Sequence, residues 1–276
     1  MRGWWREIAG LVLPVACGGC GRPRAGLCPR CEAGLTGSGP RRVRPRPEPP
    51  GLPVVHAAAP YEGAVRALLL AHKERGALPL AGPLGAALAG AVAAAAGPCE
   101  ASGGGSLLLV PVPSSRSSVR ARGHDPTRRI ALAAAARLRR SGRAARVLPV
   151  LRQARPVADQ AGLGARGRLA NLAGALEVPA GGVRLLEEAG RTAGRVVLVD
   201  DLMTTGASLA EAARALGAAR SGVHRPFIPG LPDSPKGPAT EGLFEQPAAA
   251  VVASSPASFE INRNSPRTCI VAGGER

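Results

Sequence analysis

Apolar residues along the chain follow two periods. Short continuous apolar runs, typical of strands that are buried on both faces, occur at 54–59, 107–110, 147–151 and 196–199. Between these runs apolar side chains recur every three to four positions, or alanine and leucine dominate, which predicts helices over 62–72, 78–96 and 126–140. Strands and helices alternate, so the pattern predicts an α/β fold with a parallel sheet flanked by helices.

Segments rich in proline and glycine divide the chain. Residues 36–53 lack an apolar period and are interpreted as a linker between an N-terminal module, 1–35, and the main domain, 54–220. Residues 221–247 have a similar composition where such a sheet needs another strand, which indicates a long insertion, a disordered segment or an out-of-frame segment. A delayed strand and chain ending at 248–264 and a tail at 265–276 complete the division.

One helix start is marked by the sequence itself. Asp125 is a typical N-cap, and Pro126 occupies the first helical position. The preceding residues, 114–124, are rich in hydroxyl and guanidinium groups and are predicted to form a loop after the strand at 107–110. Ligands of parallel sheets bind beyond the carboxyl ends of strands. This loop and the one after 196–199 are therefore expected at the same edge of the sheet.

The strongest chemical signal lies at 196–208. Four strand-forming residues lead into Asp200 and Asp201, and an alanine-rich helical stretch comes after the loop. The two carboxylates can accept hydrogen bonds from vicinal ribose hydroxyls, while backbone N–H groups at a helix N-terminus suit a 5′-phosphate. The loop residues are Met203, Thr204, Thr205, Gly206, Ala207 and Ser208.

Gly206 would let the backbone approach that phosphate closely, because it has no Cβ. The alternative interpretation of 196–208 is a plain turn with an aspartate cap and a threonine-rich loop.

Four cysteines form two closely spaced pairs. Cys17 and Cys20 make one C-x-x-C motif, and Cys28 and Cys31 make a second after seven intervening residues. This spacing predicts a structural Zn²⁺ site that four thiolates close off from substrate. The alternatives are a pair of disulfides or a redox-active C-x-x-C motif.

The net charge of +17 and the pI of about 11.4 invite a nucleic-acid interpretation. Lysine occurs only at Lys73 and Lys236, so the charge is almost entirely arginine, which fits codon bias in a GC-rich genome. No run of aromatic residues accompanies the arginines as a platform for base stacking. Weak attraction to polyanions is the most that the charge indicates.

The sequence favours a cytoplasmic location. No apolar stretch is expected to be long enough to span a membrane. The first sixteen residues could be a short signal peptide ahead of Cys17, but Glu7 interrupts its basic start. An amphipathic helix that packs on the body is favoured instead, with its apolar anchors at Trp4, Trp5, Ile8, Leu11 and Val12.

Taken in order, these segments resemble the ComF family, amidophosphoribosyltransferase-like proteins linked to competence for DNA uptake. The strand and loop at 196–208 are similar to the ribose-phosphate motif of type I phosphoribosyltransferases, which use phosphoribosyl pyrophosphate (PRPP). Residues 120–125 resemble the family's Arg-x-Arg-Gly-Phe-Asn, with His124 and Asp125 as departures. The other matching segments are 13–21 with the second cysteine pair, 61–63, the region of Lys73, 110–113, 155–160, Arg168 and Asn171.

The resemblance implies a type I phosphoribosyltransferase fold with an N-terminal zinc ribbon. It also implies PRPP binding with Mg²⁺ and displacement of pyrophosphate by an acceptor that the sequence does not identify. Asp200 and Asp201 would be the catalytic acids. Candidates for holding pyrophosphate are Arg116, Arg120, Arg122 and Lys73, although arginines in so arginine-rich a chain are often solvated surface residues. The alternative is a non-catalytic accessory protein of DNA uptake that binds single-stranded DNA or a helicase partner.

Overall fold

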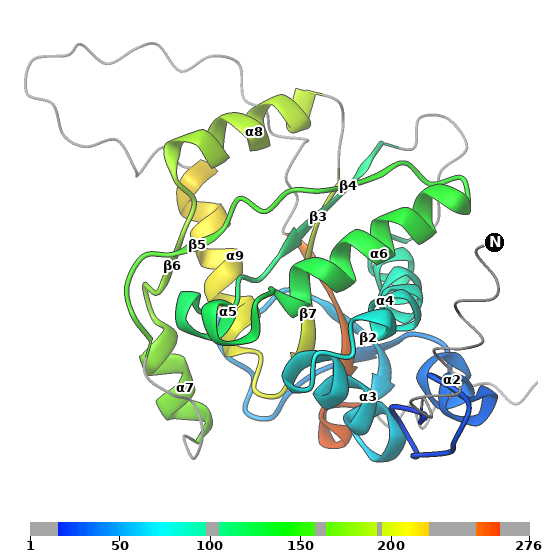
Figure 1. Cartoon of the computed structure of the whole chain (residues 1–276). Coiled ribbons are helices and arrows are strands. Elements are labelled where there is room, and N and C mark those ends of the chain that lie inside the picture. The colour runs from blue at the N-terminus through cyan, green and yellow to red at the C-terminus, as the bar shows by residue number, and fades with distance from the viewer. Residues whose placement is uncertain (1–15, 98–104, 158–163, 192–194, 221–246, 260–276) are drawn as a thin grey trace, which may run out of the picture.

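A computed structural model describes residues 16–97, 105–157, 164–191, 195–220 and 247–259. These residues form an α/β fold around a six-stranded, mostly parallel sheet with helices on both faces, as the sequence predicts (Figure 1). The order of strands across the sheet is β1 (Arg41–Val43), β2 (Val55–Pro60), β8 (Ala248–Ser254), β7 (Arg195–Met203), β3 (Leu107–Pro111) and β4 (Ala145–Val147). Only β1 is antiparallel to its neighbour.

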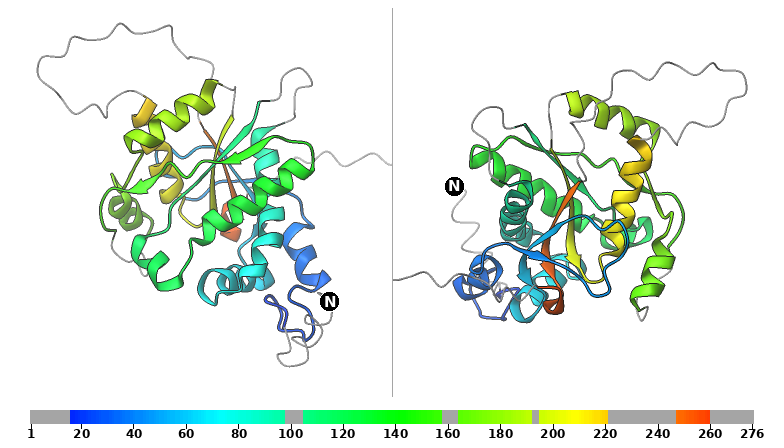
Figure 2. Two further views of the ribbon diagram at one scale, coloured as in Figure 1. Left: turned by 45° about the horizontal axis from the view of Figure 1, so that its top comes forward. Right: turned by 180° about the vertical axis from the view of Figure 1, so that it is seen from behind.

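Both faces of the central strands are buried, which explains their continuous apolar sequences. In β7, Val197 and Val199 belong to one core, whereas Val196 and Leu198 belong to the other. Helices α3 (Gly63–Glu74), α4 (Ala81–Ala96) and α6 (Pro126–Arg140) cover the first face, and α8 (Ala180–Arg191) and α9 (Ala207–Arg220) cover the second (Figure 2).

The delayed strand expected after residue 247 is confirmed. Strand β8 pairs in parallel with β2 on one side and with β7 on the other. The 3₁₀ turn Pro256–Ser258 follows it. Residues 221–246 and 260–276, on which the interpretations of an insertion, of a family-type ending and of a tail depend, lie outside the described residues.

Three expectations about local structure were wrong. Residues 36–53 are not only a linker, because β1 pairs there with β2 and buries Val43. Residues 114–124 are not only a loop: α5 (Arg116–Arg122) starts where the Ser115 side chain accepts a hydrogen bond from the Ser118 backbone N–H. The strand expected at 147–151 ends at Val147, because only residues 145–147 pair with β3.

The helix at 78–96 corrects the expectation about membrane spans. Its 19 residues, a 3₁₀ turn at Leu78–Leu80 followed by α4, are long and apolar enough to cross a membrane by length and composition. Just over half of its most apolar window, 56%, is buried inside the protein. It packs against α6, β2 and β8, which is how a core helix of a folded domain behaves.

The described part of the N-terminal module is continuous with the main core. Helix α2 (Pro29–Thr36) packs against α3, α4 and β2, and three of the four clustered cysteines join the core on that face. A Cβ added to Gly19 would lie 2.8 Å from the Cys31 sulfur, so glycine is needed for this close approach. The helix predicted within residues 1–15 lies outside the described residues.

Short elements beside α9 complete the fold. Strands β5 (Arg152–Gln153) and β6 (Leu176–Glu177) form a separate antiparallel ladder. Between them in sequence, α7 (Ala165–Leu172) packs against the start of α9, where Leu172 and Ala207 share a small core.

Candidate functional site

The acidic pair lies at the carboxyl end of the central strand β7. The apolar run indicated a strand that ends at Val199, with the two aspartates after it. The strand instead continues to Met203, so Asp200 and Asp201 lie on the strand itself. Pairing with β3 ends at Val199, whereas pairing with β8 continues to Met203. The acidic pair therefore occupies the place where the sheet opens on the β3 side, a usual position for ligand sites in parallel sheets.

Asp201 is bridged to a helix that precedes it by 128 residues in sequence. The ammonium of Lys73, near the end of α3, donates to Asp201 Oδ2 over 2.8 Å. Burial alone would lower the pKa of Lys73, but the Asp201 carboxylate outweighs that effect and raises the pKa. The two groups form an ion pair at the carboxyl end of β7.

Asp200 is held differently from its neighbour. Its Oδ1 accepts hydrogen bonds from the Asp201 backbone N–H over 2.8 Å and from the Thr127 hydroxyl over 3.4 Å. Burial raises the pKa of Asp200 well above its ordinary value, and repulsion from Asp201 raises it further against the attraction of Lys73. The ionised form of Asp200 is thus under-stabilised in the protein alone, and hydroxyl donors or a cation would stabilise it.

The loop after β7 carries several backbone N–H groups without acceptors among the described residues. Among the residues that the structure describes, no acceptor bonds the backbone N–H groups of 204–208, which lead into the first turn of α9. The Met203 carbonyl accepts from Ser255 N over 3.0 Å and from Ser254 Oγ over 3.2 Å, which fixes the start of the loop. Free N–H groups at a helix N-terminus form a binding site for an anion.

Gly206 is constrained by its own backbone conformation and by the segment 36–53. Its φ of +76° is accessible to glycine at little cost, and an added Cβ would lie 3.0 Å from both terminal carbons of Leu52. The atoms closest to this added Cβ belong to Leu52 and Pro45, so the segment 36–53 packs against the loop at Gly206.

One arginine near the loop was named in the sequence only as part of the family resemblance. Arg168 of α7 donates from Nη1 to the Thr204 hydroxyl over 3.0 Å. Nothing in the local sequence assigns it this place, since 36 residues separate the partners and only the packing of α7 on α9 joins them.

The four candidates for binding pyrophosphate fall into two groups. Lys73 binds Asp201, and Arg122 forms two bonds of 2.7 and 2.9 Å with Glu74, so both are engaged in ion pairs. Arg116 and Arg120 on α5 are exposed. Arg116 also lines a cavity of about 270 Å³ together with residues 153–157.

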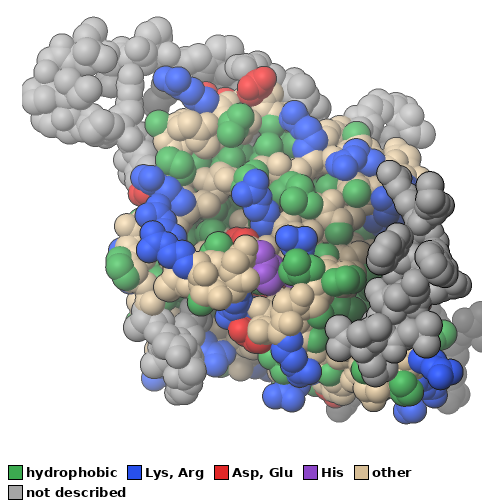
Figure 3. Space-filling view, viewed as in Figure 1, with side chains coloured by type: hydrophobic (Ala, Val, Ile, Leu, Met, Phe, Trp, Pro, Cys, Tyr) green, Lys and Arg blue, Asp and Glu red, His purple; other side chains and the backbone are tan. Residues whose placement is uncertain are grey.

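Two histidine rings, those of His72 and His124, pack together next to Lys73. His72 is fully buried, and its ring meets the edge of His124 with centroids 5.7 Å apart. Burial lowers the pKa of His72, which is therefore neutral at physiological pH. Figure 3 shows a histidine in a hollow of this face, with carboxylates and basic side chains around it.

The four cysteines converge as their spacing predicts. Their sulfurs all lie within 4.8 Å of one another, and Cys20 and Cys28 are 3.6 Å apart, close to the roughly 3.8 Å between sulfurs that bind one Zn²⁺ tetrahedrally at about 2.3 Å. Burial would raise the pKa of Cys17, but backbone N–H groups of Cys20, Cys28 and Gly19 lower it to about 6. This cluster could bind a metal ion such as zinc.

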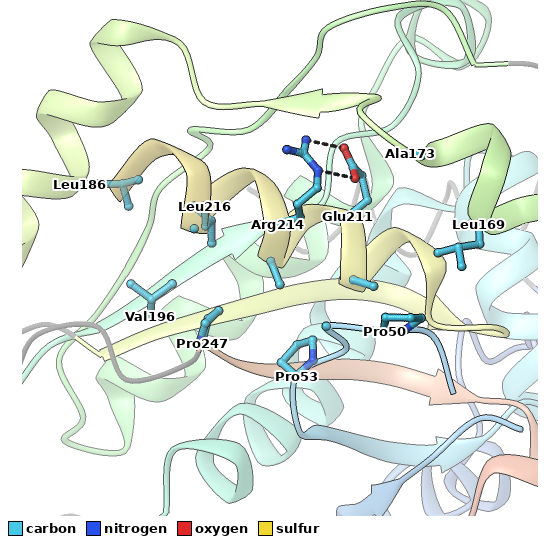
Figure 4. A pocket seen from close by; sticks show the side chains of 14 residues that line it. Pro50, Pro53, Leu169, Ala173, Leu186, Val196, Glu211, Arg214, Leu216 and Pro247 are labelled. Carbon is cyan, nitrogen blue, oxygen red and sulfur yellow. Dashed lines mark hydrogen bonds and ion pairs between the residues drawn. The ribbon is translucent and has the colours of Figure 1, made fainter. Parts of the chain in front are cut away.

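A second cavity lies away from the acidic pair. Its volume is about 580 Å³, and it lies along α9 beside α8 and the segment 50–53 (Figure 4). Its lining is mostly apolar, apart from the ion pair of Glu211 and Arg214 at 2.7 Å. Neither Asp200, Asp201 nor any residue of 203–208 lines this cavity.

No model of a protein family matches the chain, and no curated protein matches it.

Proposed function

We propose that this chain binds PRPP, or a related ribose 5-phosphate ester, at the carboxyl end of β7. The observation that supports this most is the adjacency of two groups of complementary chemistry on one short stretch of chain. Asp200 and Asp201 offer carboxylates for the vicinal hydroxyls of a pentose, and the unpaired N–H groups of 204–208 offer donors for its terminal phosphate. A pentose phosphate carries both kinds of group on one molecule.

The same arrangement suits transfer of the phosphoribosyl group. In that reaction a nucleophile forms a bond to C1 of the ribose while the bond from C1 to pyrophosphate breaks, and positive charge develops on the ring. Two carboxylates beside the ring would stabilise this charge, and the loop would hold the sugar in place.

Mg²⁺ belongs to the proposal as a partner of the ligand. It prefers phosphate and hydroxyl oxygens and keeps an octahedral shell that includes water. In the described part of the chain, the cysteines form the only group of three or more side chains suited to a metal. Mg²⁺ would therefore arrive with the pyrophosphate and contact the protein through at most the acidic pair.

Calorimetric titration of PRPP with Mg²⁺ tests this function. We expect the parent protein to bind, and D200N/D201N to bind at least about 100-fold more weakly, because two charged hydrogen-bond acceptors are lost. The matched control is E187Q/E188Q, which neutralises an adjacent pair of exposed acids on α8 and should bind as the parent does. D200N alone retains the Lys73 bridge, so it separates loss of binding from loss of folding. Absence of binding by the parent would refute the proposal.

For the cysteine cluster we propose one structural Zn²⁺, held by Cys17, Cys20, Cys28 and Cys31. The cluster joins the same core as α3, so the metal would fix residues 16–36 against the helix that carries Lys73. Metal analysis should find one zinc per chain, lost in C28S. A folded parent without metal would contradict this assignment.

A further inference from the structure

Helix α7 places a guanidinium group over the start of α9. Leu172 of α7 is buried against Ala207, the first residue of α9, and the partly buried Leu169 packs on the same small core. From this anchored helix, Arg168 reaches the loop and donates from Nη1 to the Thr204 hydroxyl over 3.0 Å. Its position relative to the loop is therefore set by the packing of two helices.

The guanidinium of Arg168 has more donors than the described protein atoms satisfy. An arginine side chain carries five N–H groups in a planar fork. Arg168 Nε is buried and has no hydrogen-bond partner among the residues that the structure describes. Within the same residues it forms no ion pair with a carboxylate. A buried donor without an acceptor destabilises a fold, so such a group indicates a partner still to be bound.

The positive charge of Arg168 is also unfavourable where it lies, near the N-terminus of α9, unless an anion is bound. The N-terminus of α9 carries a partial positive charge, and cations near a helix N-terminus are destabilising. The backbone N–H groups of 204–208, beside the Thr204 hydroxyl that Arg168 bonds, have no acceptor among the described residues. A positively charged side chain and several backbone donors without acceptors among the described residues therefore lie close together, an arrangement that an anion would stabilise.

We propose that Arg168 binds the terminal phosphate of the sugar ester as a dianion, and that it sets the preference for the doubly charged form. Nη1 holds the Thr204 hydroxyl, and the remaining donors of the fork, Nε among them, face the phosphate oxygens. Arginine suits this role because its planar fork matches phosphate geometry. This inference rests on the proposed function, and it adds a residue from a different helix to the loop.

Titration with ribose 5-phosphate tests the role of Arg168, and R166Q is the matched control. Arg166 lies on the same helix two residues earlier and is exposed, so its loss should leave affinity unchanged. We expect R168Q to bind ribose 5-phosphate about 10- to 100-fold more weakly, the usual effect of losing a charged hydrogen bond.

Two further readouts separate phosphate binding from a structural role. A phosphomonoester loses its second proton near pH 6, so parent affinity should fall between pH 7.5 and pH 5.5, and R168Q should show a smaller fall. Asp200 is present in both proteins, so its own titration cancels in this comparison. Guanidinium ion at millimolar concentration should restore part of the affinity of R168A.

The outcomes distinguish the two proposals. If the parent binds neither PRPP nor ribose 5-phosphate, the proposed function fails and this inference fails with it. If the parent binds and R168Q binds equally well, the role of Arg168 alone is refuted. Weak binding by R168Q with an unchanged pH slope, and no rescue of R168A by guanidinium, would make Arg168 a structural residue and also refute the inference.

Discussion

Two groups of charged residues lie along helix α9, and they differ in how completely their donors and acceptors are hydrogen-bonded. On its cavity side, Glu211 accepts two bonds from Arg214 and one from the Leu176 backbone N–H, and Arg214 also donates to the Leu176 carbonyl. Near its N-terminus, Arg168 Nε and the backbone N–H groups of 204–208 have no acceptor among the described residues. At the end of β7, Asp200 accepts from the Asp201 N–H and the Thr127 hydroxyl but forms no ion pair within those residues.

The pKa values of two carboxylates express the same contrast. Burial would raise the pKa of Glu211, but bonds from Arg214 and Leu176 outweigh it and lower the pKa. Burial and the charge of Asp201 raise the pKa of Asp200. The ionised form of Glu211 therefore stabilises the fold, whereas the ionised form of Asp200 destabilises it. A group of the first kind serves structure, and a group of the second kind is suited to binding.

The largest expected effect on stability is at Glu211, whose carboxylate is fully hydrogen-bonded by Arg214 and the Leu176 N–H. E211Q removes the charge that Arg214 and the Leu176 N–H bind, and should lower the free energy of unfolding by about 2–3 kcal/mol while leaving PRPP affinity unchanged. Denaturant unfolding measures this effect. E48Q is the control, because the Arg44–Glu48 pair is solvent-exposed and its loss should change stability by less than about 1 kcal/mol. Equal effects of the two variants would abolish the contrast.

A smaller effect is expected for the phosphate loop. G206A places a Cβ at φ +76° and 3.0 Å from Leu52, which should cost about 1–2 kcal/mol of stability and weaken ligand binding. G142A is the matched control: Gly142 has φ +84°, but a Cβ added there would have no described atom within 4 Å. The difference between the variants therefore measures the contact with Leu52. If G206A bound ligand as tightly as G142A does, the loop would have no close geometric requirement.

The smallest expected effect on stability is at Asp200, where removing the charge should raise the free energy of unfolding and not lower it. D200N keeps the acceptor for the Asp201 N–H but removes the buried charge, so it should stabilise the protein wherever Asp200 is ionised in the parent. The carboxyl's raised pKa means that the folded state binds the proton more tightly than the unfolded state. The parent should therefore lose stability relative to D200N as pH rises from the ordinary value of 3.8 to the raised folded value.

Glu211 provides the opposite pH dependence. Its lowered pKa gives stability that is present above the ordinary value of 4.5 and is lost as pH falls through the folded value. Unfolding free energies of the parent, D200N and E211Q measured across this acid range should show slopes of opposite sign for the two sites. Slopes of the same sign would contradict the assignment of one carboxylate to structure and the other to binding.

Several parts of this site could be predicted from the sequence because each depends on neighbouring residues. The strand, the acidic pair and the loop are contiguous at 196–208, and the Asp125 cap acts only three residues away, on Arg128 N. The two C-x-x-C motifs bring sulfurs together through tight local turns. Other features depended on pairing with distant segments: β1 exists because β2 lies beside it, and β7 extends past Val199 because β8 continues to pair with it.

The sequence by itself determined the alternation of strands and helices, the acidic pair with its loop, and the cysteine cluster, since periodicity and short-range hydrogen bonding fix such features locally. Only the tertiary structure decided which charges meet. Lys73 reaches Asp201 across 128 residues, Arg122 is engaged by Glu74, and Arg168 reaches Thr204. Contacts of this kind follow from the packing of helices on a sheet, because side chains that are remote in sequence become neighbours only after the whole domain has formed.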